Sequence, residues 1–258
     1  KSPRKDADTW KKRERHSPSK ENSMNTRNHY LDIFKVTEQQ LHTLATTALV
    51  HGGDYCDLYF EHTTFFNLLL KDGVVSSGGF HTDFGVGIRV LKGEKTGYAY
   101  SENTEMKDML DAARAASAIA AGSTVSGRVY ARVTDRRSDF YPMKKNWRDC
   151  GADSFLPFLQ ELEKEIFGRD SRIVKVIIRL SNSVSDVLMY NSLGELTYET
   201  RPMGSITATA VFQQDGKTEN RTASRSFRMG AELISPALIK EMADEAVKGI
   251  DNRFEAIR

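Results

Sequence analysis

The stretch from Gly85 to Ser101 places two alternating segments on either side of a short turn. In the first segment the apolar residues recur at every second position, at Val86, Ile88 and Val90. Lys92-Gly93-Glu94 then supplies a turn, and the chain returns through Thr96, Tyr98 and Tyr100. Alternation of period two around a glycine-containing turn predicts a β-hairpin, with the glycine in the positive-φ conformation that such a turn requires.

The same stretch contains Gly, Lys and Thr, the residue types of a phosphate-binding loop. That loop requires Gly-Lys-Ser/Thr without interruption and a helix directly after it. Here Glu94 separates Gly93 from Lys95, and the residues after Thr96 have the pattern of a strand. The spacing therefore favours the hairpin over nucleotide binding.

Composition is that of an ordinary globular protein. Of 258 residues, 39% are hydrophobic and 28% are charged, which permits a substantial core. No apolar run approaches the roughly 20 residues that a membrane helix needs, so we expect no membrane partner. The two cysteines, Cys56 and Cys150, are too few for a disulfide framework, and we expect a reducing, cytoplasmic setting.

Charge is distributed unevenly along the chain. Residues 1–29 carry nine Lys and Arg against four Asp and Glu, so the remaining residues have a net charge of −3 although the whole chain has +2. The first segment shows no apolar periodicity, which predicts a disordered tail, or an extension that precedes a start at Met24. The acidic remainder argues against a nucleic-acid partner.

The pattern of the rest predicts an α+β fold made of two similar units, residues 30–122 and 153–258, joined by a connecting segment, residues 123–152. In each unit a helix precedes several antiparallel strands and a second helix follows them, so the sheets are mixed, mostly antiparallel, and covered by helices. The expected strands span 54–61, 64–71, 74–80, the hairpin at 85–101, 173–181, 185–191, 196–201, 205–214 and 218–227. The helices begin near the capping box at Thr37, near Thr104, at Phe155 and at Ser235-Pro236.

No residue pattern for a metal site or a nucleophile stands out. All six histidines lie in the first 81 residues, and none belongs to a His-Glu-x-x-His motif. His62 and His81 could converge only if their strands were neighbours, and two separate strand histidines are the simpler expectation. We expect no catalytic residue, metal ligand or cofactor in this chain.

Three blocks of sequence resemble one protein family. GVGIRVLKGEKTGYAYSE, the upstream DYCDLYFE and the intervening LKDGVVSSGGF are similar to the amino-terminal half of the TldD/PmbA family, over roughly residues 37–258. Its members were first named modulators of DNA gyrase, and they are similar to metalloproteases that process or degrade small unfolded peptides. The family's metal motif, His-Glu-x-x-x-His, lies in the carboxy-terminal half and does not occur here. The resemblance implies a divalent metal, zinc, for the full-length protein, and no activity for this chain alone.

Four polar residues are candidates for binding a substrate or partner: Arg89, Glu94, Lys95 and Arg201. The alternative is a solvated strand face with weak surface ion pairs. Exposed strand edges could also bind an extended peptide by β-addition.

The resemblance implies an amino-terminal domain that shapes access of a peptide substrate and subunit assembly, in a homo- or hetero-oligomer with a TldD/PmbA-like subunit. Two alternatives stay open. One is a non-catalytic PmbA-like subunit that binds a partner or peptide, and the other is a modulator of DNA gyrase.

Overall fold

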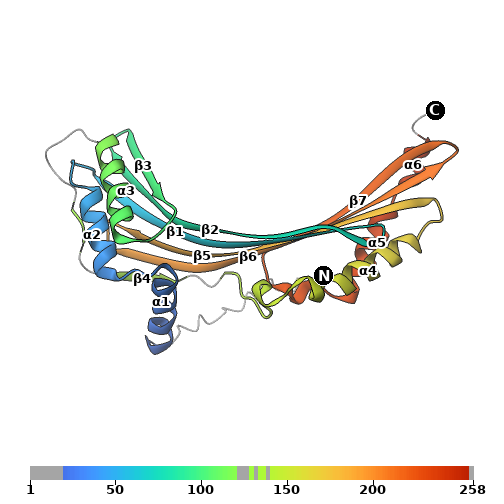
Figure 1. Cartoon of the computed structure of the whole chain (residues 1–258), viewed down its shortest axis with the longest axis horizontal. Helices are drawn as coiled ribbons and strands as arrows, with labels where there is room; N and C mark the ends of the chain where they lie inside the picture. Colours follow the sequence, from blue (N-terminus) through green and yellow to red (C-terminus); the bar gives the residue numbers. More distant parts are fainter. Residues whose placement is uncertain (1–19, 121–127, 131–132, 138–139, 256–258) are drawn as a thin grey trace, which may run out of the picture.

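The computed structural model describes residues 20–120, 128–130, 133–137 and 140–255 (Figure 1). Its helices are α1 (Lys20–Phe34), α2 (Glu38–Ala48), α3 (Met106–Ile119), α4 (Ala152–Phe167), α5 (Pro236–Val247) and α6 (Ile250–Glu255), with short 3₁₀ helices η1 (Trp147–Asp149) and η2 (Ala231–Leu233). Its strands are β1 (Tyr55–Lys71), β2 (Val74–Lys92), β3 (Lys95–Ser101), β4 (Thr134–Arg137), β5 (Ile173–Asn191), β6 (Glu195–Gln214) and β7 (Lys217–Phe227).

The strands form one sheet in the order β3-β2-β1-β5-β6-β4, and β7 also pairs with β6. Every pairing is antiparallel except the short parallel pair of β4 and β6. The predicted α+β class with a mostly antiparallel sheet is confirmed.

The predicted duplication is visible in the element order. A helix, three strands and a helix occur twice, as α2-β1-β2-β3-α3 and as α4-β5-β6-β7-α5. The first strands of the two halves, β1 and β5, pair with each other from Asp57 opposite Asn191 to Lys71 opposite Ile177. Strands of both halves therefore belong to a single continuous sheet.

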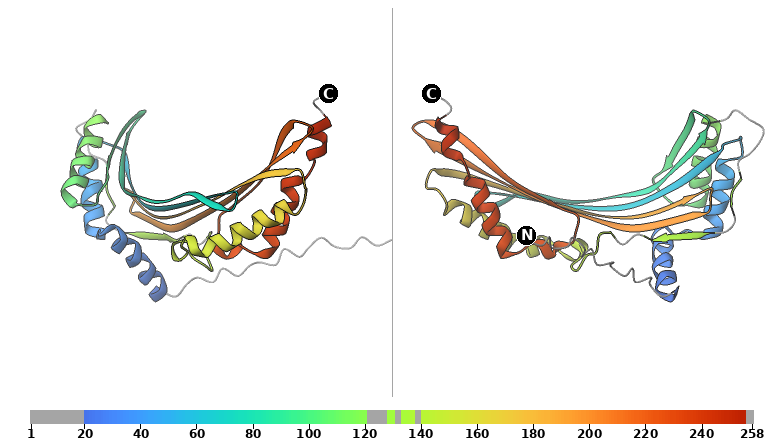
Figure 2. Two further views of the ribbon diagram at one scale, coloured as in Figure 1. Left: turned by 45° about the vertical axis from the view of Figure 1, so that its right-hand side comes forward. Right: turned by 180° about the vertical axis from the view of Figure 1, so that it is seen from behind.

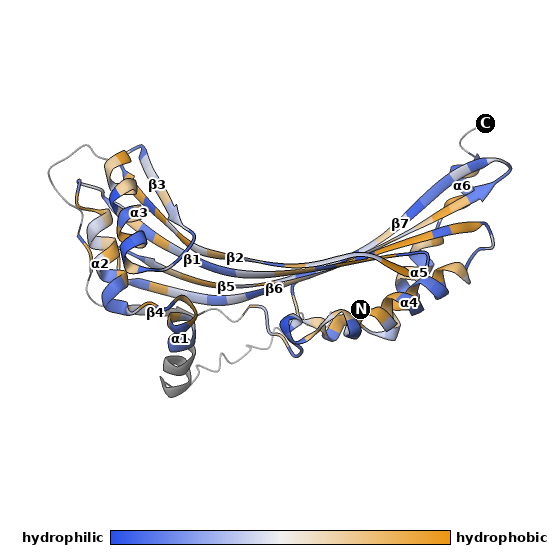
Figure 3. Ribbon diagram, in the orientation of Figure 1, coloured by the Kyte–Doolittle hydropathy of each residue, from blue (hydrophilic) through white to orange (hydrophobic). Residues whose placement is uncertain are grey.

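The helices lie on one side of this curved sheet, and its concave side carries no helix among the described residues (Figures 1 and 2). Two separate cores fill the covered side. Leu58, Phe60 and Ile88 pack beneath α1, α2 and α3 in one core, while Ile178 and Ile206 pack beneath α4 and α5 in the other. Outside these apolar cores, the strand β7 at one end of the sheet is coloured largely hydrophilic in Figure 3.

The hairpin is present as predicted. β2 and β3 pair from Val86 opposite Ser101 to Lys92 opposite Lys95, around a turn in which Gly93 has φ 54°. Val86, Ile88 and Val90 are at most 2% exposed. A helix does not follow the turn, so the hairpin interpretation holds.

The predicted breaks inside four strands are wrong. The segments 54–61 and 64–71 are one strand, β1, and β2, β5 and β6 likewise run through the gaps expected within them. The polar residues at these places are paired across strands and do not form turns, as when Thr63 Oγ1 donates a hydrogen bond to Ser185 Oγ at 2.7 Å. Polar residues suit the middle of the sheet because it lies between the two helix-covered cores.

Two predictions about irregular segments are also corrected. Helix α1 begins at Lys20, inside the predicted tail 1–29, and its Tyr30, Leu31 and Phe34 are buried against the sheet. Residues 1–19 lie outside the described residues. Within the predicted connection 123–152, residues Thr134–Arg137 form β4, and Trp147 is buried, its ring above Gly204.

Candidate functional site

The concave side of the sheet, which we call the open face, is lined by every second residue of β1. Cys56, Leu58 and Phe60 point into the helix-covered core, so the alternate residues Asp57, Tyr59, Glu61 and Thr63 point the other way. The strand register adds their partners on β2, β5 and β6 to the same face.

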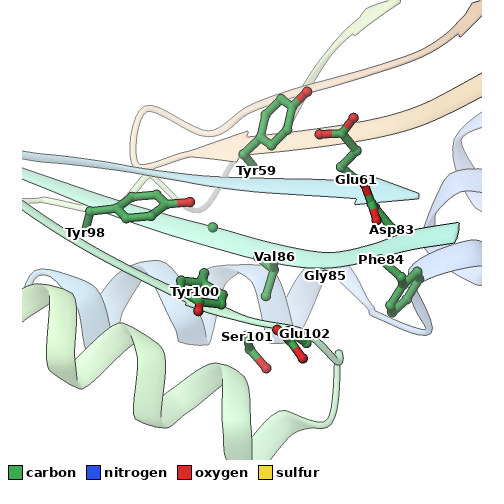
Figure 4. Close-up of a pocket in the computed structure, with 11 residues that line it drawn as sticks. Tyr59, Glu61, Asp83, Phe84, Gly85, Val86, Tyr98, Tyr100, Ser101 and Glu102 are labelled. Carbon is green, nitrogen blue, oxygen red and sulfur yellow. The ribbon is translucent and has the colours of Figure 1, made fainter. Parts of the chain in front are cut away.

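A hollow of about 270 Å³ lies where β1, β2 and β3 meet. Three tyrosines and three carboxylates help to line it: Tyr59, Tyr98, Tyr100, Glu61, Asp83 and Glu102. Figure 4 shows Tyr59, Glu61 and Asp83 rising on the same side of β1 and β2, with Tyr98 lying beside them. The aromatic rings offer apolar surface, and the carboxylates make the hollow acidic.

Two glycines of β2 let the hollow form. A Cβ at Gly87 would lie 2.6 Å from the hydroxyl oxygen of Tyr98, which is far too close. A Cβ at Gly85 would lie 2.4 Å from the carbonyl oxygen of Ser101. Glycine at these positions therefore allows Tyr98 to lie across β2 and the end of β3 to approach it.

Arg89 belongs to the open face and is held by a buried carboxylate. Its Nε and Nη2 donate to Asp57 Oδ2 at 3.0 and 2.6 Å, across the register pair that joins β1 and β2. Asp57 is buried while the Arg89 side chain is half exposed. The hydrogen bond to Asp57 raises the pKa of the Arg89 guanidinium above its ordinary value. The guanidinium stays charged and keeps a solvent-facing side.

Arg201 does not line the hollow itself but contacts Tyr59, which does. Its Nε donates to Glu199 Oε1 at 2.6 Å, and its Nη1 donates to the Tyr59 hydroxyl at 3.4 Å. Partial burial, and then the charge of Glu61, raise the pKa of Tyr59, although Arg201 opposes the shift. Tyr59 therefore stays protonated near neutral pH and keeps a hydroxyl for hydrogen bonding.

The four predicted site residues fall in two places. Arg89 and Arg201 lie on the open face on either side of Tyr59. Glu94 and Lys95 lie at the exposed hairpin tip, where neither side chain makes a hydrogen bond or ion pair among the described residues. The tip is instead fixed by Asp54, whose carboxylate accepts from Lys92 Nζ at 2.8 Å and from the Gly93 amide at 3.0 Å.

Sequence reasoning missed the lining residues Tyr59, Glu61 and Asp83. The alternation in DYCDLYFE indicates that polar and apolar residues occupy opposite faces. It does not show that the polar face stays uncovered, because that depends on where the helices pack.

A second polar group, on the helix-covered side between the two cores, was also missed. Asp186 is 1% exposed and accepts hydrogen bonds from Arg148 Nη1 and from Thr200 Oγ1, both at 2.7 Å. The Thr200 hydroxyl is also 2.7 Å from the Tyr30 hydroxyl. His62 Nδ1 lies 3.8 Å from Asp186. This network ties α1 and the segment around η1 to the sheet.

The described residues contain no group of three or more His, Cys, Asp or Glu side chains that could hold a metal. His62 and His81 do not converge. His62 points to the helix-covered side beside Asp186, while His81 is on the open face, stacked on Phe65 at 4.4 Å between ring centroids. The residues present thus do not fit a divalent metal, and no chemical step is assigned to one in this chain.

Neither cysteine is placed for nucleophilic chemistry. Both thiols are buried, and neither forms a disulfide. Burial, with the charge of Asp57 adding to it, raises the pKa of Cys56 to about 12. Cys56 is therefore a protonated core residue near neutral pH.

The fold and the site define a domain built on long strands, with helices on one side and a polar face that no described residue covers on the other. Residues 56–120 match the family model for PmbA/TldA metallopeptidase domain 1, and residues 145–252 match that for the PmbA/TldA metallopeptidase central domain. The chain belongs to the PmbA/TldD family.

Comparison with curated proteins finds metalloprotease relatives. The chain is 27% identical over 210 residues to a metalloprotease TldD homologue from Haemophilus influenzae, which covers 80% of this chain and 42% of that protein. It is 22% identical over 185 residues to a TldD homologue from Buchnera aphidicola, with 72% and 38% covered. The chain spans less than half the length of these relatives.

Solved structures share the fold. A proposed modulator of a DNA gyrase from Thermotoga maritima aligns with TM-score 0.62 and 19% identity, over 84% of this chain and 48% of that one. TldE from Thermococcus kodakarensis aligns with TM-score 0.55 and 12% identity, over 90% and 47%. None of the described helices has the length and apolar character needed to cross a membrane.

Proposed function

We propose that this chain is the amino-terminal part of a longer TldD-like metalloprotease that processes or degrades small unfolded peptides. In this proposal the open face shapes the access of the peptide, and the metal, zinc, is held outside this chain. The supporting observation is the uncovered concave sheet face, with its hollow of tyrosines and carboxylates. Concave sites lined by aromatic side chains and a few polar groups are where proteins commonly bind ligands.

The site residues suit binding without sequence selection. Tyrosine rings offer contact area at small entropic cost, and the half-exposed Arg89 guanidinium can donate to peptide carbonyl groups. The carboxylates Glu61, Asp83 and Glu102 would attract basic side chains of a peptide. None of these contacts requires a particular residue at a particular place in the peptide.

The hairpin tip is proposed as a subunit contact. Glu94 and Lys95 are exposed and make no ion pair among the described residues, so both charges are free to meet a partner. That partner is a second TldD/PmbA-like subunit, in a homo- or hetero-oligomer. We place the assembly in the cytoplasm.

The proposal is tested by peptide turnover in the full-length protein. Arg201→Ala removes the contact with Tyr59, and we expect kcat/KM for an unstructured peptide to fall about tenfold, the effect of roughly 1.4 kcal/mol. Arg225→Ala is the matched control, because Arg225 also pairs with a glutamate, Glu241, but lies on the helix-covered side. Equal activity of both variants and the parent would contradict the proposal. Peptide binding without any turnover would instead indicate a non-catalytic subunit.

A further inference from the structure

More than half of the outer edge of β2 has no neighbouring strand in the part of the chain that the structure describes. β3 pairs only with Val86–Lys92, and no strand among the described residues pairs with the outer side of residues 74–85. All residues from Val74 to Asp83 are exposed. Such an edge presents backbone N–H and C=O groups in the spacing that another strand requires.

This edge lacks most of the features that keep sheet edges from pairing. Its sequence, VVSSGGFHTD, contains no proline, lysine or arginine. One irregularity in register occurs, opposite Leu69 and Leu70, and the rest is regular. Large apolar side chains are exposed along it, with Val75 at 42% and Phe80 at 68%. Gly78 and Gly79 carry no side chain that would obstruct an approaching backbone.

A second hollow lies beside this edge, on the helix-covered side of the sheet. It has about 280 Å³ and is lined by Phe66 and Phe80, which are register partners, and by Trp147 and the backbone around Gly151. Its aromatic residues offer a surface for an apolar side chain, while Arg148, Asp149 and Asn182 make another part of its lining polar. It is separate from the hollow of the open face, with which it shares no lining residue.

Asn182 gives this second hollow a polar group that lacks a partner. The residue lines the hollow and is 8% exposed, and its Nδ2 makes no hydrogen bond among the described residues. A buried amide without an acceptor costs free energy, and an oxygen of a bound ligand would satisfy it.

The surroundings are acidic. Asp149 lines the hollow, Asp83 is the last residue of the free edge and faces the open side, and Asp153 is in the first turn of α4; none of the three forms an ion pair among the described residues. Arg148 also lines the hollow, but its charge is paired with the buried Asp186 at 2.7 Å. At the end of the free edge next to Val74, the opposite charges of Lys71 and Asp72 offset each other. The uncompensated charge therefore favours a basic partner and opposes pairing with the same edge of a second copy, which carries no lysine or arginine.

We propose that an extended polypeptide segment, with an apolar side chain flanked by lysine or arginine, adds to residues 74–83 as a further strand. Its apolar side chain leans over Phe80 toward the hollow that Phe66 and Trp147 also line. The site deepens the proposed function, since it gives this chain a second contact for an unfolded peptide away from the open face.

The test uses fluorescence anisotropy with a labelled eight-residue peptide that alternates lysine with apolar residues and has one central phenylalanine. We expect saturable binding that weakens at least tenfold when glutamate replaces lysine. Two N-methylated peptides, each blocked at one alternate set of amides, separate strand addition from simple side-chain binding. Strand addition predicts that one of the two loses binding and the other keeps it.

Variants locate the site. Phe80→Ala should weaken binding at least tenfold while leaving the melting temperature unchanged, because Phe80 is exposed. Phe167→Ala removes an exposed phenylalanine that lines neither hollow and should leave binding of this peptide unchanged, while Tyr98→Ala reports separately on the hollow of the open face. Absence of saturable binding, insensitivity to Phe80→Ala, or equal binding of both methylated peptides would overturn the proposal. Binding lost only with Tyr98→Ala would overturn it too, while supporting the open face as the peptide site.

Discussion

Arg201 Nη1 lies 3.4 Å from the hydroxyl of Tyr59, although 142 residues separate them in the sequence. The contact crosses β5, which lies between their strands β1 and β6. Tyr59 comes from the first half of the duplicated fold and Arg201 from the second. The candidate site of the open face therefore depends on the joining of the two halves into one sheet.

The buried face of the hairpin should dominate its contribution to stability. Ile88 is fully buried, so Ile88→Ala should lower the free energy of unfolding by about 2–5 kcal/mol. Lys95→Ala should change it by less than about 0.5 kcal/mol, because the side chain is exposed. Urea unfolding of both variants measures the difference. A large loss with Lys95→Ala would mean that the tip is held by that amine.

The pair of Arg148 and Asp186 should be costly to break. Arg148→Leu leaves the buried Asp186 carboxylate without its cation, and we expect a loss of about 3 kcal/mol in the free energy of unfolding. Arg169→Ala is the control, because its partners Glu165 and Asp244 are solvent-exposed and such pairs contribute about 0–1 kcal/mol. Similar losses for both variants in urea unfolding would refute this assignment.

Protonation of His62 should destabilise the fold. Burial, with the positive charge of Arg148 adding to it, lowers the pKa of His62 below 6.5, and Asp186 opposes the shift only in part. The unfolded chain then binds the proton more readily than the folded one, so this contribution to stability is present above pH 6.5 and is lost as the pH falls below it. The decrease in unfolding free energy from pH 7.5 to 5.5 should be smaller for His62→Gln than for the parent. A larger decrease in the variant would show that the sign is wrong.

Cys56 should be unreactive in the folded chain. Its thiol is buried and its pKa is raised to about 12, so almost no thiolate exists at pH 8. A thiol reagent should label Cys56 only after denaturation, which mass spectrometry of the modified peptides can show. Rapid labelling of the native chain at this residue would mean that α2 opens readily from the sheet.

Local patterns were sufficient for several elements. The capping box is present, with the Thr37 side chain accepting from the Gln40 amide and the Gln40 side chain accepting from the Thr37 amide. The hairpin and the repeated order of helix, strands and helix also follow from short-range periodicity. These features depend on neighbours in the sequence, and alternation is enough to reveal them.

The remaining features depend on contacts between distant residues. Strands β1 and β5 run without a break through polar residues because cross-strand partners such as Thr63 and Ser185 hydrogen bond to each other. Arg89 and Arg201 are recognisable as charged strand residues, but their position around Tyr59 follows from strand register across the whole sheet. The buried Asp186 network needs α1, β5, β6 and the η1 segment together, which no local pattern predicts.

In the proposed function the peptide meets the open face, whereas the exposed end of α4 around Phe167 takes no part in binding. This central claim is tested most directly by photocross-linking in the full-length protein, with a benzophenone amino acid placed at Tyr98 on the open face or at Phe167 on α4. Both side chains are exposed, at 56% and 38%. We expect an unstructured peptide to be cross-linked from position 98 and not from position 167. Equal cross-linking from both positions, or cross-linking from position 167 alone, would contradict it.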